Sequence, residues 1–169
     1  MSVTVHRARG PERVSCAIVT VSDTRTPETD TSGSAIASLL ETAGHQVASR
    51  VLVRDDVDAV TRAVADALDA GPVDAVVLTG GTGLSARDST YEAVTALFEK
   101  TIDGFGELFR ALSYAEIGTA AMLSRAVGGV ARRRAVFCLP GSPKAVRLAV
   151  ERLILPELGH LLGQLRRAP

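Results

Sequence analysis

The apolar run Ala75–Leu78, "AVVL", leads directly into Thr79–Ala93, "TGGTGLSARDSTYEA", and this junction is the starting point for a fold prediction. A continuous run of mostly β-branched residues is typical of a strand that is buried on both faces of a sheet. Three glycines follow within four positions, at 80, 81 and 83, and glycine adopts backbone conformations that other residues avoid. We therefore expect a buried strand that ends in a tight turn with unshielded backbone N–H groups.

Strand-like and helix-like patterns alternate along the rest of the chain. Strand patterns occupy residues 14–21, 46–53, 74–79, 125–131 and 133–140, and helix patterns occupy residues 34–43, 55–71, 90–100, 106–113 and 143–165, the last with a break before Pro156. Such alternation is typical of a mostly parallel sheet with helices on both faces. The sequence thus predicts one α/β domain, a three-layer α/β/α sandwich, over residues 13–169, with residues 1–12 as a loose arm.

The composition narrows the class of protein. The chain has 169 residues, 46% of them hydrophobic, which suits one domain with a proper core. Lys and Arg total 19, as do Asp and Glu, so the net charge is zero and we expect no nucleic-acid or anionic-membrane partner. Cys16 and Cys138 lie in apolar runs and are expected to be inert core thiols. The absence of a signal sequence and of a run of about 18 apolar residues favours a soluble, cytoplasmic protein.

Polar segments follow four of the predicted strands. They are "SDTRTPETDTSG" (22–33), "RDD" (54–56), "GGTGLSARD" (80–88) and "PGSPK" (140–144). Ligands of open α/β sheets bind at the carboxyl ends of the parallel strands. We therefore expect these four loops to meet at one edge of the sheet and to form a binding site there.

The glycine loop predicts a site for an anion. Its N–H groups are unshielded, and a helix expected to begin near Thr90 adds further donors. The alternative is that the glycines merely turn the chain, although three glycines with Thr82 exceed what a turn requires. The loop lacks the Gly-Lys-Ser/Thr of a P-loop. It also follows the third strand, with no acid-ended strand about twenty residues on, so a dinucleotide fold is not indicated.

Two acidic positions flank this loop. Asp55 or Asp56 ends the second strand and Asp88 follows the glycines. Taken singly, each is more typical of a helix cap or a solvated charge. Taken together beside bound phosphates, they predict a Mg²⁺ site, because Mg²⁺ binds one or two carboxylates plus substrate phosphates.

Other polar side chains are expected to complete the site. Ser22, Asp23 and Asp30 lie in the first loop. In "PGSPK", Ser142 is expected to cap the last helix and Lys144 to face an anion, with plain helix initiation an equal alternative. Arg87 and Arg125 are further candidate cations.

The motifs together resemble a known family. "VTVSDTR", "DTSG", "TGGTGLSARDSTYEA", "DGFGELFR", "LSRAVGGV" and "LPGSPKAV" occur in the order and spacing of the MogA/MoaB family of molybdenum-cofactor biosynthesis proteins, over roughly residues 14–158. The resemblance implies a three-layer α/β domain that binds molybdopterin and assembles as a trimer or a hexamer. It also implies contact with a molybdenum-insertion protein. Active members use Mg²⁺ and ATP to adenylylate molybdopterin and release pyrophosphate.

The resemblance also assigns roles to individual residues. Asp55 and Asp88 match the family acids implicated in catalysis or Mg²⁺ binding. The phosphate-binding turn is matched by Gly80, Gly81, Thr82 and Gly83. The remaining substrate-binding positions are matched by Ser22, Asp23, Glu107, Ser142 and Lys144.

Two alternatives remain within the family. Tyr91 and Asp103 stand where proline is common, which favours the MoaB branch, whose members do not all adenylylate. The intact acids favour an active enzyme, whereas the MoaB-like features favour a non-catalytic molybdopterin-binding scaffold. A small-molecule-binding domain of flavodoxin-like or regulatory type, the third alternative, does not account for the ordered motifs.

Overall fold

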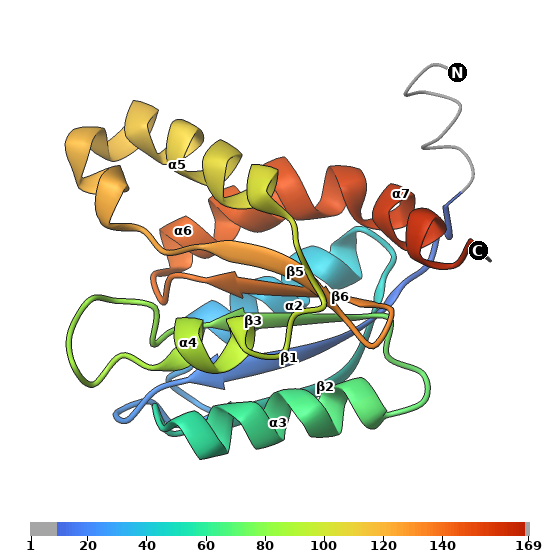
Figure 1. The fold of residues 1–169 in the computed structure, drawn as a ribbon, viewed down its shortest axis with the longest axis horizontal. Coiled ribbons are helices and arrows are strands. Elements are labelled where there is room, and N and C mark those ends of the chain that lie inside the picture. The colour runs from blue at the N-terminus through green and yellow to red at the C-terminus, as the bar shows by residue number, and fades with distance from the viewer. Residues whose placement is uncertain (1–9, 168–169) are drawn as a thin grey trace.

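The protein is described from a computed structural model that covers residues 10–167. Within this range the strands form a six-stranded sheet in the order β2-β1-β3-β6-β5-β4 (Figure 1). The strands are β1 (Ser15–Val21), β2 (Gln46–Val53), β3 (Ala75–Thr79), β4 (Lys100–Thr101), β5 (Val127–Ala131) and β6 (Arg134–Leu139). The first four strands in spatial order are parallel, and β5 and β4 pair antiparallel at one edge. The prediction of a mostly parallel sheet is confirmed.

Helices cover both faces of the sheet. They are α2 (Thr31–Thr42), α3 (Val57–Asp69), α4 (Thr90–Thr95), α5 (Asp103–Ile117), α6 (Pro143–Ala149) and α7 (Leu155–Leu165), with a 3₁₀-helix η1 (Gly118–Leu123) and a π-helical segment η2 (Val150–Ile154). Apolar residues of α2, α5, α6 and α7 pack on one face, and those of α3 and α4 pack on the other. Figure 1 shows these three layers. The chain is therefore a three-layer α/β/α sandwich, as predicted.

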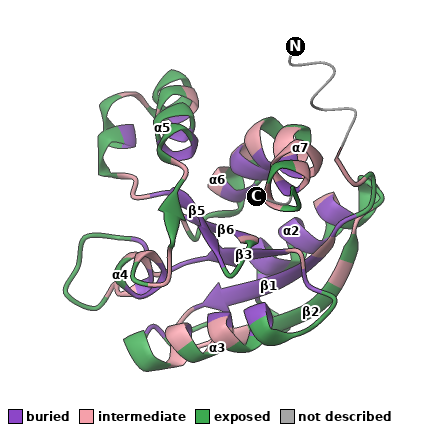
Figure 2. Cartoon of the chain, turned by 45° about the vertical axis from the view of Figure 1, so that its right-hand side comes forward, coloured by how far each residue is buried: buried purple, intermediate pink, exposed green. Residues whose placement is uncertain are grey.

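The central strands are buried on both faces (Figure 2). All five residues of β3 and the last six of β1 are buried, which explains their continuous apolar sequence. Edge strand β2 is mostly exposed. Cys16 and Cys138 are buried, free thiols, and burial raises the pKa of each to about 12, in agreement with an inert core role.

Several boundaries differ from the prediction. The helix expected over 34–43 begins at Thr31, because the Asp30 carboxylate caps it by accepting from the N–H of Gly33 at 2.8 Å. The helix expected over 90–100 ends at Thr95, and Lys100 begins β4 instead. This part of the prediction was wrong because the apolar residues of 97–98 suit either kind of element.

The C-terminal helix is interrupted where a break was expected. Residues 143–165 remain helical, but the segment just before Leu155-Pro156 is π-helical. Pro156 lacks the N–H that would close an α-helical turn, which favours such an irregularity. Of the predicted arm, residues 1–9 lie outside the described range. Gly10 packs on α7, where an added Cβ would lie 1.9 Å from the carbonyl oxygen of Gly159. Among residues 10–167, no helix is long and apolar enough to cross a membrane.

Candidate functional site

The loops after β1, β2, β3 and β6 meet at the carboxyl edge of the parallel strands. The Arg87 guanidinium donates to the Asp23 carboxylate through Nε at 2.8 Å and Nη2 at 3.1 Å, which joins the third loop to the first. The backbone N–H of Asp55 donates to Asp23 Oδ1 at 3.2 Å. The Ser32 hydroxyl donates to the carbonyl oxygen of Gly141 at 2.7 Å. The predicted convergence of four loops is thus present.

The glycine loop is shaped by two successive left-handed residues. Gly80 has φ +100° and Gly81 has φ +64°. A Cβ on Gly80 would lie 2.1 Å from the carbonyl oxygen of Val21. A Cβ on Gly81 would lie 2.1 Å from Thr90 Oγ1 and 2.6 Å from Asp55 Oδ2. At both positions a positive φ, which glycine adopts without strain, is combined with a close approach that leaves no room for a Cβ.

Consecutive N–H groups of this loop are unpaired. Those of residues 81–84 donate to no acceptor within the described range 10–167. Their neighbours do donate: Gly80 to the carbonyl oxygen of Leu139 at 3.1 Å, and Ser85 to Asp88 Oδ2 at 3.0 Å. Successive unpaired N–H groups in a turn form an anion-binding concavity. The loop therefore has the donors that the sequence predicted for it.

The start of α4 contributes differently from the prediction. The N–H of Ser89 donates to Asp55 Oδ1 at 3.1 Å, and that of Thr90 donates to the carbonyl oxygen of Gly81 at 3.0 Å. These two donors are occupied inside the protein and are not available to a ligand; a contribution from the next N–H groups of the helix stays a prediction. The loop itself carries the unpaired groups.

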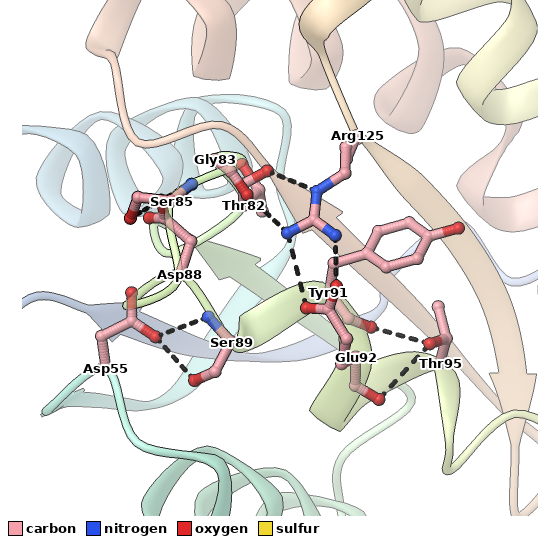
Figure 3. A network of polar contacts seen from close by, with 10 residues as sticks. All are labelled: Asp55, Thr82, Gly83, Ser85, Asp88, Ser89, Tyr91, Glu92, Thr95 and Arg125. Carbon is pink, nitrogen blue, oxygen red and sulfur yellow. Dashed lines mark hydrogen bonds and ion pairs between the residues drawn. The ribbon is translucent and has the colours of Figure 1, made fainter.

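Adjacent acids Asp55 and Asp56 have different roles. Asp56 is the N-cap of α3, and its Oδ1 accepts from the N–H of Ala59 at 3.0 Å. Asp55 is only 7% exposed, and its Oδ1 accepts from the N–H and, at 2.8 Å, the hydroxyl of Ser89. Of the two positions left open by the sequence, Asp55 is the one that faces the glycine loop (Figure 3).

Asp88 lies at the far end of the loop. Its Oδ2 accepts from the N–H of Ser85 at 3.0 Å and from the Ser85 hydroxyl at 2.6 Å. A Cβ on Gly83 would lie 2.6 Å from the same oxygen. The carboxylate is therefore held against the glycine backbone, beside the unpaired N–H groups.

The arrangement fits a Mg²⁺ ion held jointly with phosphates. Asp55 Oδ2 and Asp88 Oδ1 accept no hydrogen bond from any residue in the range 10–167. The buried hydroxyl of Thr90, beside Gly81, is also without a partner in this range. No group of three or more His, Cys, Asp or Glu side chains among the described residues forms a complete metal cage. Mg²⁺ does not need one, because it binds few carboxylates and retains water and phosphate ligands.

The first loop contacts the second and third loops through Asp23, which accepts from the N–H of Asp55 and pairs with Arg87. The hydrogen bond from Arg87 lowers the pKa of Asp23 below its ordinary value. The Ser22 hydroxyl accepts from the N–H groups of Thr24 at 3.2 Å and Arg25 at 3.0 Å, and it therefore shapes its own turn.

The remaining predicted residues are spread more widely. The Ser142 hydroxyl caps α6 by accepting from the N–H of Ala145 at 3.2 Å. Lys144 forms an ion pair with Glu116 of α5 at 3.3 Å. Glu107 lines a separate cavity of about 410 Å³ that also contains Arg110. The structure thus brings Ser142 to the glycine loop but places Glu107 beyond it.

A cavity of about 470 Å³ lies over the glycine loop. Its polar residues include Gly81, Thr82, Gly83, Asp88 and Ser142, and its apolar residues include Phe109, Ile117 and Leu123. A smaller cavity of about 200 Å³ lies on the other side of the loop, next to Ser22 and Gly80. A cavity lined by apolar side chains together with a few polar groups is typical of a small-molecule site.

Sequence reasoning missed Ser89, and it identified Arg125 without the contacts that Arg125 makes. Ser89 holds Asp55 with two hydrogen bonds, and Arg125 reaches the loop from a segment 42 positions after Gly83. A serine after an acid carries no distinctive signal, whereas Arg125 was identified only as a candidate cation.

Fold and site together define an α/β/α protein with an anion-binding glycine loop and two flanking carboxylates. Comparisons with known proteins agree. A family described as "Probable molybdopterin binding domain" matches residues 17–160. Molybdenum cofactor biosynthesis protein B of Bacillus cereus is 54% identical over 168 residues, which cover 99% of each chain.

Solved structures give the same result. A crystal structure of a molybdenum cofactor biosynthesis protein B has a TM-score of 0.91 at 54% identity, covering 94% of this chain and 99% of that one. The tungsten cofactor synthesizing protein MoaB from Pyrococcus furiosus has a TM-score of 0.83 at 37% identity, covering 93% and 99%. The chain belongs to the molybdopterin-binding domain family of the MoaB/MogA type.

Proposed function

We propose that the protein binds molybdopterin and adenylylates it with ATP and Mg²⁺, releasing pyrophosphate. The observation that carries this proposal is the set of unpaired N–H groups at residues 81–84, flanked by Asp55 and Asp88. N–H donors bind phosphate oxygens, and the flanking carboxylates suit a metal ion shared with those phosphates. Such a site favours chemistry at phosphorus.

The reaction depends on the positioning of the phosphates more than on covalent catalysis by protein side chains. A terminal phosphate oxygen of molybdopterin attacks the α-phosphorus of ATP, and the bond to the pyrophosphate oxygen breaks. The loop N–H groups hold the phosphates in place. Ser89 fixes Asp55 and Ser85 fixes Asp88, so that each carboxylate keeps one oxygen free.

A Mg²⁺ ion bound at Asp55 and Asp88 would neutralise charge on the transferring phosphates and on pyrophosphate. The apolar wall of the cavity, with Phe109 and Leu123, is suited to a flat ring such as a pterin or an adenine.

The proposal includes a homo-oligomer, a trimer or a hexamer, that works in the cytoplasm and contacts a molybdenum-insertion protein. Five large apolar residues on α5 and η1 are exposed: Leu108, Tyr114, Ile117, Met122 and Leu123. Such a concentration is typical of an interface with another protein. Light scattering of the purified protein measures the number of subunits.

The activity is tested with purified protein, molybdopterin, ATP and Mg²⁺. We expect transfer of AMP to molybdopterin with one pyrophosphate released for each transfer. Asp88→Asn is expected to abolish turnover and to leave pterin binding intact. Asp58→Asn, in the first turn of α3, is the control and should behave as the wild type, because Asp58 lines neither cavity at the loop.

Two results would contradict the proposal. One is the absence of AMP transfer while a genuine adenylyltransferase works in parallel. The other is Asp88→Asn turnover equal to that of the wild type. Pterin binding without turnover would instead support the non-catalytic scaffold.

A further inference from the structure

Arg125, between η1 and β5, reaches the glycine loop from a distant part of the chain (Figure 3). Its Nε donates to the carbonyl oxygen of Thr82 at 3.0 Å, and its Nη2 donates to the carbonyl oxygen of Gly83. Its side chain is 21% exposed. The guanidinium therefore binds two successive carbonyl groups of the loop.

These contacts fix the direction of two peptide groups. A trans peptide is planar, and its C=O and N–H point in opposite directions. The described backbone contains no cis peptide. Because Arg125 holds the carbonyl oxygens of Thr82 and Gly83, the N–H groups of Gly83 and Leu84 point away from Arg125. Both belong to the unpaired set at residues 81–84.

Two side chains of α4 hold the guanidinium itself. Glu92 forms an ion pair with Nη1 of Arg125 and lies 3.4 Å from Nη2 through its second carboxylate oxygen. The ring of Tyr91 lies against the guanidinium, with 4.8 Å from its carbon to the ring centroid. The hydrogen bond from Arg125 also lowers the pKa of Glu92, which keeps the partner charged. Four of the five guanidinium N–H groups are engaged with the protein.

A lysine could not replace this arrangement. Its ammonium is a single point charge, whereas a guanidinium is a rigid plane with donors in fixed directions. Only a guanidinium can donate at the same time to two loop carbonyls and to a carboxylate that lie in different directions. Arg125 has its donors committed to the loop and to Glu92, so its role differs from that of a cation that binds a ligand directly.

We propose that Arg125 is a positioning residue, which orients the N–H groups of Gly83 and Leu84 toward the phosphates of the nucleotide. This inference rests on the proposed function, because it names a residue on which the phosphate site depends. Tyr91 and Glu92 hold Arg125 in place. The ring of Tyr91 contacts the guanidinium directly.

The test compares Arg125→Met and Arg125→Lys with Arg132→Met. Arg132 lies in the hairpin between β5 and β6 and pairs with Asp69 on the surface. Two quantities are measured: the ¹⁵N order parameters of the Gly83 and Leu84 amides, and kcat and KM for ATP. In Arg125→Met we expect the order parameters to fall from about 0.85 to below about 0.6. We expect KM for ATP to rise about tenfold with a much smaller change in kcat.

Arg125→Lys is expected to restore little of either quantity, and Arg132→Met should match the wild type. A purely structural role for Arg125 would lower the melting temperature without changing KM or the loop amides. Should Arg125→Met not fold, Tyr91→Leu and Tyr91→Phe replace it. The first removes the ring and should raise KM and loosen the loop, and the second keeps the ring and should not.

The two claims fail separately. Wild-type loop order parameters and wild-type KM in Arg125→Met would overturn the positioning role and leave the proposed function standing. A wild-type protein without AMP transfer would overturn the proposed function. In that case the order parameters alone decide whether Arg125 positions the loop.

Discussion

Two tight turns of the molecule place two successive residues in the left-handed conformation, and they do so with different residues. The turn after β3 uses Gly80 at φ +100° and Gly81 at φ +64°. The hairpin between β5 and β6 uses Arg132 at φ +49° and Arg133 at φ +60°. Left-handed backbone costs a non-glycine residue about 1–2 kcal/mol, so the hairpin accepts a strain that the first turn avoids.

The difference lies in what surrounds each turn. At Gly81 an added Cβ would meet Thr90 and Asp55 within 2.6 Å. At the hairpin the side chains extend into open surroundings, where Arg132 pairs with Asp69 and Arg133 donates to the carbonyl oxygen of Leu165 at 3.0 Å. Close approach, rather than a positive φ by itself, requires the glycines. The first turn serves the site, and the hairpin only connects two strands.

Gly81→Ala should give the largest effect. Its Cβ would displace Asp55 or Thr90, so we expect loss of AMP transfer and a decrease of about 3 kcal/mol in the free energy of unfolding. Gly44→Ala is the control, because Gly44 also has a positive φ of +87° but nothing within 4 Å of its Cβ position. It should lose only about 1 kcal/mol and keep full activity. Urea titration measures the free energy of unfolding, and release of pyrophosphate measures activity. Equal losses of stability and activity in Gly81→Ala and Gly44→Ala would show that close approach at Gly81 is not the cause.

Asp55→Asn should give the next largest effect. The amide keeps the shape of the side chain but removes the charge beside the loop, which is expected to lower kcat by about 10²–10³. The neighbouring Asp56→Asn is the matched control, since asparagine caps a helix as well as aspartate does. Steady-state kinetics measure kcat for the two variants. Similar rates in both would show that Asp55 carries no charge that the reaction needs.

Relief of strain in the hairpin should have a smaller, opposite effect. Asparagine and glycine are the preferred residues for a two-residue turn of this kind. Arg132→Asn combined with Arg133→Gly is therefore expected to raise the free energy of unfolding by about 1 kcal/mol and to leave activity unchanged. Thermal and urea unfolding measure the gain. A loss of stability would mean that the side-chain contacts of the two arginines outweigh the strain.

The smallest expected effect concerns the ion pair that joins the first loop to the third. Arg87 lowers the pKa of Asp23 below 3.8, so the pair contributes stability above the unfolded pKa and loses it as the pH falls through the folded pKa. In Arg87→Met the pKa of Asp23 should rise toward 3.8, as ¹³C NMR titration of the carboxyl carbon can show. If the pKa of Asp23 is the same in Arg87→Met and in the wild type, Arg87 is not the cause of the lowered value.

The fold was predictable because its signals are local. Continuous apolar runs at β1 and β3 and the periodic pattern at α3 follow directly from burial on two faces or one. The end of the helix at Thr95 was not predictable, since the pairing of Lys100 with Val130 in the sheet depends on a strand far along the chain. Competition between local pattern and tertiary pairing decides such boundaries.

The site was predictable in its composition but not in its connections. The glycines, Asp55 and Asp88 follow strands, and the topology of a parallel sheet brings such positions together. The assignment of Asp56 to the cap and Asp55 to the site depends on side-chain directions that a sequence does not encode locally. The hydrogen bond from Arg125 to the carbonyl oxygen of Thr82 joins residues 43 positions apart, so it could not be predicted without the fold.

The most direct test of the phosphate site is an NMR titration of ¹⁵N-labelled protein with ATP and Mg²⁺. We expect the largest shifts at the backbone amides of Gly81, Thr82, Gly83 and Leu84, because their N–H groups gain acceptors on the phosphates. Saturable shifts concentrated elsewhere in the molecule, with these four amides unmoved, would contradict this expectation.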